Sequence, residues 1–265
     1  MIGYGNSAFV RRNFEPGLPP IDPDAQAFIT AAAITDPTQQ AAINTLVVDL
    51  KGYGIWTKEK AIYPFVGGSA AQHKWNLKDP RDLDAAFRLV FNGGWTHSST
   101  GALPNGTNAW ANTYLNPNGL IGLNSISFGV YSRTDIDRLA PSIGNVTGGA
   151  TGESSLWLRY QNSLIARVNS SLFLNPGNPN STGLILANRT SATQVNISIR
   201  GTQTTINNNS NGVYSANFQL GGVSPNFFDN KQLAFASIGD GLTAQNMIDL
   251  TTAVNAFQTT LGRQV

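Results

Sequence analysis

The fold of this chain is decided by residues 194–200, which read Gln194-Val195-Asn196-Ile197-Ser198-Ile199-Arg200. Apolar residues occupy every second position, and polar residues fill the positions between them. Successive side chains of a β-strand point to opposite faces of a sheet, so this alternation predicts a strand with one buried face and one solvated face. Such strands are typical of antiparallel sheets.

Eight further short runs predict strands of the same kind, at 61–66, 87–91, 125–132, 155–160, 163–168, 182–188, 213–220 and 232–237. Clusters of turn-forming residues separate them, of which the richest is Asn175-Pro176-Gly177-Asn178-Pro179-Asn180. Many short strands between such turns predict a mainly β protein whose central unit is an antiparallel β-sandwich or jelly roll.

Helices are predicted on both sides of this β region. A short one spans 24–33, and a second begins at Asp36-Pro37, where Asp36 can cap the first turn, and stops at Gly52. A C-terminal helix is predicted for 243–261 with Thr243 as its N-cap. It carries an apolar seam in heptad steps at Met247, Leu250, Val254, Phe257 and Leu261. The seam indicates packing on the domain, or a contact near the axis of an oligomer.

The domain organisation follows from these patterns. Residues 21–60 form a helical segment, and residues 61–265 form the sandwich domain with its C-terminal helix. Residues 1–20 contain too many Gly and Pro residues for a regular element. They are nevertheless too apolar for a free tail, so we predict an extended docking arm that packs on its own domain or on a neighbouring subunit through Tyr4, Phe9, Val10 and Phe14.

Composition excludes several classes of protein. Charged residues make up 12% of the 265 positions and the net charge is +2, so the clustered basic face of a nucleic-acid-binding protein is not expected. No apolar run reaches the length of a membrane span. The chain has no cysteine, which excludes disulfides, thiolate metal sites and cysteine catalysis.

Two resemblances add to this reading. Leu220-Gly221-Gly222, the stretch 227–231 and the strand 233–238 resemble the closing segment of concanavalin A-like/laminin-G-like jelly-roll domains. The stretches 43–56, 93–101 and 234–265 resemble a group of bacteriophage virion proteins found as fibre, tail or decoration components. The first resemblance implies the jelly roll, and the second implies the virion as the setting.

Catalytic chemistry is weakly represented. Sandwich glycosidases need two carboxylates beside the scissile bond, and this chain has three glutamates, of which none lies two residues from another acid on a predicted strand. Asp135 and Asp137 are the best remaining pair, and they could equally hold a calcium ion. We therefore predict no enzyme activity, assign no catalytic residue, and expect no cofactor apart from this weak calcium candidate.

Binding is the more strongly predicted activity. The region 93–119, interpreted as loops, is rich in aromatic and amide side chains, which together recognise the C–H faces and hydroxyls of sugars. It equally suits an aromatic-anchored protein interface. The predicted ligand-binding residues are Trp95, His97, Asn105, Asn108, Trp110 and Tyr114.

Three functions remain in order of preference. The first is a structural component of a bacteriophage virion that assembles as a homo-oligomer, such as a trimer, with other virion proteins, and that is located in the virion after assembly in the host cytoplasm. The second is a carbohydrate-binding module that recognises a host surface glycan. The third is a glycan hydrolase.

Overall fold

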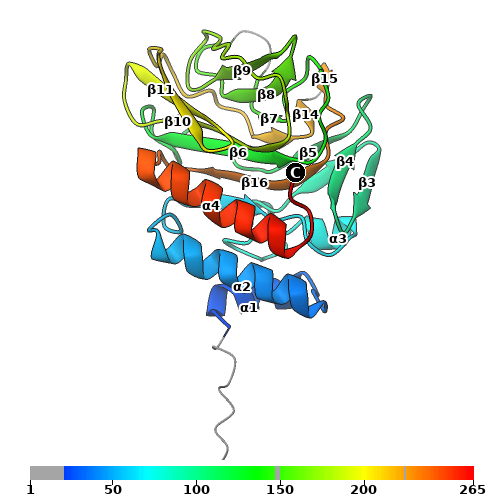
Figure 1. Cartoon of the computed structure of the whole chain (residues 1–265). Coiled ribbons are helices and arrows are strands. Elements are labelled where there is room, and N and C mark those ends of the chain that lie inside the picture. The colour runs from blue at the N-terminus through cyan, green and yellow to red at the C-terminus, as the bar shows by residue number, and fades with distance from the viewer. Residues whose placement is uncertain (1–20, 147–149, 224) are drawn as a thin grey trace, which may run out of the picture.

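The computed structural model describes residues 21–146, 150–223 and 225–265. The predicted docking arm, with Tyr4, Phe9, Val10 and Phe14, lies outside the described residues. The described part forms three layers, which are a six-stranded sheet, an eight-stranded sheet and a layer of helices (Figure 1). The mainly β class and the antiparallel sandwich predicted from the sequence are therefore confirmed.

The larger sheet runs in the order β12-β11-β10-β6-β16-β4-β3, and β1 also pairs with β16. All of its pairs are antiparallel. Its strands are β12 (Thr202–Asn207), β11 (Gln194–Ile199), β10 (Gly183–Arg189), β6 (Ile126–Ser132), β16 (Leu233–Gly239), β4 (Gly101–Pro104), β3 (Trp95–Ser98) and β1 (Glu59–Tyr63).

The smaller sheet runs in the order β2-β5-β13-β7-β8-β9, again with antiparallel pairs. Its strands are β2 (Val90–Asn92), β5 (Trp110–Asn112), β13 (Gln219–Leu220), β7 (Ile143–Gly144), β8 (Ser155–Tyr160) and β9 (Ser163–Arg167). A separate hairpin joins β14 (Gly222–Val223) to β15 (Phe227–Phe228).

The main core lies between the two sheets. The residues that alternate inward along β11, Val195 and Ile197, are buried there, and Ile199 packs against the same core. Phe128 from the larger sheet meets Phe218 from the segment before β13, with ring centroids 5.4 Å apart. The alternation that predicted the strand thus reflects burial of one of its faces.

A second core lies under the helices. Helix α1 spans Pro23–Ala31, α2 spans Pro37–Gly52 and α4 spans Ala244–Thr260. Helices from near both ends of the described chain meet here, because α2 and α4 lie side by side over the larger sheet (Figure 1). The apolar seam of α4 is buried in this core, which confirms that it packs on the domain.

The predicted helix caps are confirmed. Asp36 accepts a hydrogen bond from the backbone N–H of Gln39 at 2.8 Å. Thr243 accepts one from the backbone N–H of Asn246 at 3.1 Å. Caps depend only on neighbouring residues, which explains why the sequence predicted them. Within the described ranges, no helix combines the length and hydropathy that crossing a bilayer requires.

Other expectations need correction. The region 93–119 is not a set of loops, because it contains β3, β4 and β5. The predicted strand 213–220 is reduced to Gln219–Leu220, since the residues before it bond to several different segments, such as Tyr214 to Gly152. Strand β12 was not predicted because polar residues dominate both of its faces.

Two short helical turns, α3 (Ala70–His73) and η1 (Asp84–Ala86), interrupt the β region. The division of the chain at residue 60 stays a prediction, although the helices share a core with the larger sheet.

Candidate functional site

The structure brings together only part of the predicted ligand-binding group. Trp95 and His97 lie two residues apart on β3, with stacked rings whose centroids are 6.2 Å apart. The indole N–H of Trp95 donates to the backbone carbonyl of Asn92 at 3.1 Å and to that of Trp110 at 3.4 Å. Trp95 also packs against the main core. The partly buried Trp95 side chain therefore stabilises the fold through these hydrogen bonds and its packing against the core.

His97 is half-buried and pairs with a second histidine. Its Nδ1 lies 2.9 Å from Nδ1 of His73, so one ring must donate and the other must accept. Burial lowers the pKa of His97, and it lowers the pKa of His73 to about 3 with help from the neighbouring His97 and Arg263. Both rings are thus neutral near pH 7, and their shared hydrogen bond fastens α3 to β3.

The two predicted amides stabilise their own turn. The side-chain oxygen of Asn105 accepts backbone N–H groups from residues 107, 108 and 109, and its nitrogen donates to Asn108. The side-chain oxygen of Asn108 also accepts the N–H of Gly94. Tyr114, which follows β5 with φ 56°, is held by a hydrogen bond from its N–H to Asn112. These hydrogen bonds fix the local backbone, and they use the side-chain oxygens of Asn105 and Asn108 within the protein itself.

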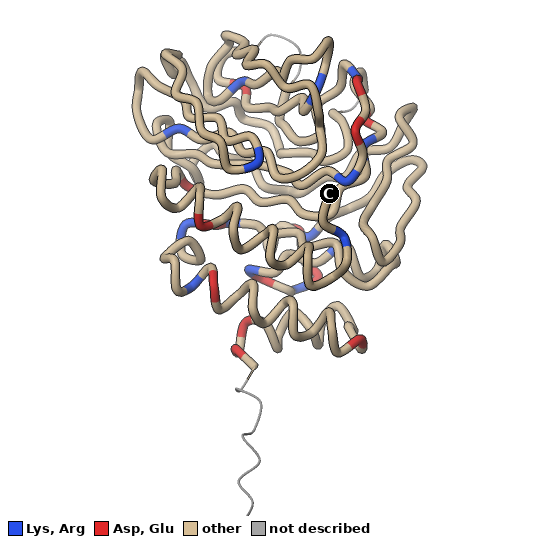
Figure 2. Tube along the Cα trace, viewed as in Figure 1, with Lys and Arg blue, Asp and Glu red and all other residues tan. Residues whose placement is uncertain are grey.

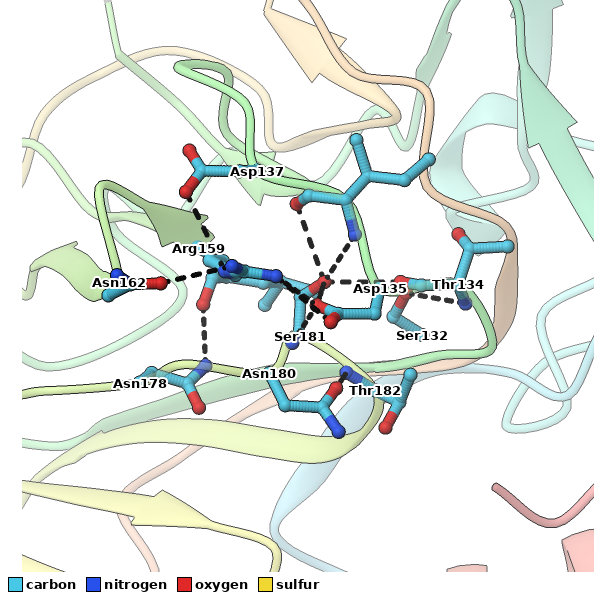
Figure 3. Close-up of polar contacts among 12 residues, drawn as sticks. Ser132, Thr134, Asp135, Asp137, Arg159, Asn162, Asn178, Asn180, Ser181 and Thr182 are labelled. Atoms are coloured by element: carbon cyan, nitrogen blue, oxygen red, sulfur yellow. Dashed lines mark hydrogen bonds and ion pairs between the residues drawn. The ribbon is translucent and has the colours of Figure 1, made fainter.

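The predicted acid pair is engaged in a network centred on Arg159 (Figure 3). Nη1 of Arg159 lies 2.9 Å from each carboxylate oxygen of Asp135, and Nε lies 3.6 Å from Asp137. Asp135 also accepts the backbone N–H of Ser181 at 2.9 Å. Although partial burial acts the other way, these hydrogen bonds and the positive charge of Arg159 lower the pKa of Asp135.

This network fits an ion pair better than a calcium site or a catalytic pair. Arg159 places its positive charge where a cation would bind (Figure 3). Asp135 joins the loop after β6 to the loop before β10, and Asp137 joins it to the turn between β8 and β9. Across 21–146, 150–223 and 225–265, no group of three His, Asp or Glu side chains could hold a metal ion. Charged residues are thinly spread along the chain, with both signs interspersed (Figure 2).

A different site is formed on the outer face of the smaller sheet. Along β8, Leu156 and Leu158 point into the main core, so Trp157 points to the opposite face. Its cross-strand partner Ile165 on β9 points the same way. Figure 1 places β8, β9 and β15 together at the end of the molecule away from the helices. A pocket of about 320 Å³ opens here, lined by Leu139, Trp157, Ile165, Phe173, Asn175 and Phe227.

Three aromatic rings shape this pocket. Trp157 meets Phe173 edge to face with centroids 5.9 Å apart, and it meets Phe227 in the same manner at 6.5 Å. Trp157 is 4% exposed, whereas Phe173 is 51% exposed and Leu139 is 49% exposed. A buried tryptophan thus forms one wall, and exposed apolar side chains form the rim. Exposed apolar surface of this kind marks binding sites.

Buried charges fix the rim. The guanidinium of Arg167 stacks on the ring of Phe173 at 3.8 Å, and it pairs with the carboxylate of Glu153, which is fully buried. The segment 174–176 runs along the edge of β9, because Ala166 and Leu174 exchange both backbone hydrogen bonds and Leu164 donates to Pro176. This pairing holds Asn175 at the pocket. The rim therefore rests on a regular part of the sheet.

Sequence reasoning missed this site. One sequence signal could have indicated it. In Leu156-Trp157-Leu158 the two leucines share one face of the strand, and the tryptophan lies on the other face. The contributions of Phe173 and Phe227 carried no comparable signal, since they come from segments that only the sheet order brings beside Trp157.

No protein-family model matches the sequence, and no curated protein matches it. Solved structures match at the level of fold. Domain 4 of AbnA, an extracellular arabinanase from Geobacillus stearothermophilus, solved in complex with arabinotriose, is 17% identical with a TM-score of 0.51, and the match covers 73% of this chain and 98% of that domain.

Two further structures are similar over comparable lengths. The binding domain of botulinum neurotoxin DC, solved in complex with rat synaptotagmin II, is 11% identical with a TM-score of 0.54, and 76% of this chain matches 52% of that one. Trypanosoma rangeli sialidase, solved as a covalent intermediate, is 9% identical with a TM-score of 0.51, and 80% of this chain matches 38% of that one. At these identities the likenesses show the fold alone, an antiparallel β-sandwich of the jelly-roll type.

Proposed function

We propose that this chain is a recognition domain that binds a glycan through the aromatic pocket on the outer face of the smaller sheet. The observation that carries the proposal is the convergence of Trp157, Phe173 and Phe227 on one open pocket with the amide of Asn175 among its lining residues. Aromatic faces pack against the C–H faces of sugar rings, and amides bond to hydroxyls. A pocket of about 320 Å³ lies within the usual range for small ligands.

The structural likenesses are in keeping with this proposal. One matched domain was solved with a bound oligosaccharide, arabinotriose, and 98% of its length matches 73% of this chain. The matched toxin domain was solved with a protein partner, so an aromatic side chain of a protein is the competing occupant of the pocket. We favour a glycan because an amide shares the pocket with the rings.

We also propose that the bound glycan is not hydrolysed. Asp135 and Asp137, the best candidate pair of carboxylates in the sequence, each lie within 4 Å of Arg159. The pocket itself is lined by one amide and five apolar side chains. A general acid would need a carboxyl group at the scissile bond.

The test compares substitutions of two neighbouring residues, the aromatic Phe173 and the aliphatic Leu172. Purified protein is titrated calorimetrically with arabinotriose and with a panel of neutral and sialylated oligosaccharides. Phe173→Ala should weaken binding of the recognised glycan about two- to tenfold, since an aromatic contact is worth about 0.5–1.5 kcal/mol. Leu172→Ala is the matched control, because Leu172 is 61% exposed and does not line the pocket.

Other outcomes assign the function elsewhere. Binding that survives Phe173→Ala but is lost on Trp110→Ala would return the site to the region predicted from sequence. Release of reducing sugar from the panel would contradict the absence of turnover. Saturable binding of a peptide at this pocket, with no glycan bound, would replace the glycan with a protein partner.

The virion setting rests on the resemblance of the stretches 43–56, 93–101 and 234–265, and it remains a proposal. In that setting the recognition domain would contact a host surface glycan, and other virion proteins would hold it in the particle. None of the three matched structures named above is described as a virion protein. Peptide mass spectrometry of purified virus particles tests whether the chain is a virion component, independently of glycan binding.

A further inference from the structure

Strand β12 ends the larger sheet. It pairs with β11 over the full length of both strands, from Gln194 opposite Asn207 to Ile199 opposite Thr202. In the part of the chain that the structure describes, no other strand pairs with β12. The hairpin that it forms with β11 lies at one side of the molecule (yellow in Figure 1). Its second side is therefore a free edge.

The free edge presents backbone hydrogen-bonding groups. The two strands are joined by a two-residue turn, Arg200–Gly201, in which both residues have positive φ. In such a hairpin the residues that flank the turn, here Ile199 and Thr202, bond to each other, and bonded pairs then alternate along the ladder. We therefore expect the backbone N–H and C=O groups of Gln203 and Thr205 to point away from β11.

The edge also lacks the features that usually protect one. Its sequence, Thr202-Gln203-Thr204-Thr205-Ile206-Asn207, contains no charge, no proline and no glycine. Proteins commonly block strand pairing with lysine, proline or a covering segment. The smaller sheet does so at β9, which the segment 174–176 covers. Strand β12 is instead rich in threonine, a good strand former.

A depression borders the inward face of β12. Thr202 and Thr204 lie on the same face as the core residues Ile197 and Ile199 because they pair with them. Both threonines are nevertheless exposed. They line a depression of about 560 Å³ together with Pro176, Gly177, Ile199 and Arg200.

We propose that β12 pairs with β12 of a second copy of this chain, antiparallel, about a two-fold axis at Thr204. An antiparallel pair with its axis at Thr204 sets Thr202 opposite Ile206 of the partner subunit and Gln203 opposite Thr205 of the partner subunit. Residues opposite each other then share a face of the joined sheet. Gln203 and Thr205 then exchange the free backbone hydrogen bonds. No like charges oppose each other at any of these positions.

The second copy is favoured over another protein for two reasons. A two-fold contact needs only one self-complementary surface, and an uncharged strand of threonines supplies it. The pairing also places Ile206 of the partner subunit beside Thr202, at the depression that Ile199 and Pro176 line, so an apolar side chain covers apolar surface. The three aromatic side chains of the pocket take no part in this pairing.

Cross-linking tests the axis directly, because the chain contains no cysteine. Thr204→Cys should form an intermolecular disulfide readily under mild oxidation, since its side chain would face its own copy. Thr202→Cys should cross-link at least about tenfold more slowly, because the axis sets it opposite Ile206 of the partner subunit. Equal rates for the two variants would overturn the proposed register.

Light scattering over a range of concentrations tests the dimer itself. The full chain should approach twice its mass of 28.2 kDa as concentration rises. Thr204→Lys should raise the dissociation constant about two- to fivefold, because two like charges would then be directly opposed. Thr204→Val should leave it unchanged, since valine keeps the shape and strand preference of threonine. Melting curves establish that each variant is folded.

Two outcomes contradict the proposal. One is a chain that stays monomeric at every concentration, and the other is a dimer that Thr204→Lys does not weaken. Deletion of residues 1–20 serves as the second control, since a dimer held by β12 should survive it. A dimer that is lost with the arm and unaffected by Thr204→Lys would assign assembly to the predicted docking arm.

Discussion

The guanidinium carbon of Arg167 lies 3.8 Å from the centroid of the Phe173 ring. The same guanidinium forms an ion pair with Glu153, which is fully buried, while half of Phe173 is exposed. Arg167 thus connects a charge in the interior to an aromatic side chain at the rim of the pocket. Both the stability of the sandwich and the shape of the proposed site therefore depend on Arg167.

Replacement of Arg167 should therefore be costly. Arg167→Met leaves the Glu153 carboxylate buried without this partner, and breaking a buried pair on one side typically costs about 3–5 kcal/mol. Urea unfolding measures the loss. Arg81→Met is the matched control, because its pair with Asp79 lies at the surface and should change stability by less than about 1 kcal/mol. A loss for Arg167→Met no larger than that of the control would contradict a structural role for the pair.

Glu59 predicts a dependence of stability on pH. The residue is 2% exposed at the start of β1, and burial raises the pKa of its carboxyl to about 8, although the positive charge of Lys78 acts the other way. The ordinary value is 4.5, so between these limits the folded state holds a proton that the unfolded state releases. Stability contributed by this group is therefore lost as pH rises from about 4.5 to about 8.

Glu59→Gln should remove this dependence. Each unit of pKa difference is worth about 1.4 kcal/mol, so the variant should gain on the order of 4 kcal/mol over the wild type at pH 8 and little at pH 4.5. His73, whose pKa falls to about 3, acts in the opposite direction below pH 6.5. The difference between variant and wild type isolates Glu59. A difference in unfolding free energy that stays constant from pH 5 to pH 8 would refute the assignment.

The network around Arg159 predicts indifference to calcium. Asp135 accepts hydrogen bonds from Arg159 and from the backbone of Ser181, so its oxygens are already used within the protein. Adding calcium or a chelator should shift the melting temperature by less than about 1 °C. Asp135→Asn should cost about 1–2 kcal/mol with or without calcium, because these charge-assisted hydrogen bonds weaken. Clear stabilisation by calcium that Asp135→Asn abolishes would restore the metal-site interpretation.

The elements that the sequence predicted are those with local causes. Val195 and Ile197 alternate with polar residues because one face of β11 is buried, and this alternation is visible in the sequence whatever pairs with the strand. The caps Asp36 and Thr243 bond to backbone groups three residues away, so their positions marked the helix starts. The mainly β fold with helices at both ends followed from such signals.

Other features depended on the tertiary structure. Asn105 and Asn108 have the composition of a sugar site, but their amides are used by their own turn, and composition alone does not distinguish the two roles. Strand β12 has no apolar alternation, because Ile206 is the one residue of the strand that packs against the main core, and only its pairing with β11 defines it.

The sequence by itself determined the sandwich, its helical ends and the absence of cysteine chemistry. The tertiary structure alone decided where the proposed site lies. Trp157, Phe173 and Phe227 come from β8, the segment after β9 and β15, and they meet through strand order and register. Burial of an alternating face is recorded in adjacent residues, whereas contacts between distant segments depend on how every intervening strand pairs, and no local pattern carries that information.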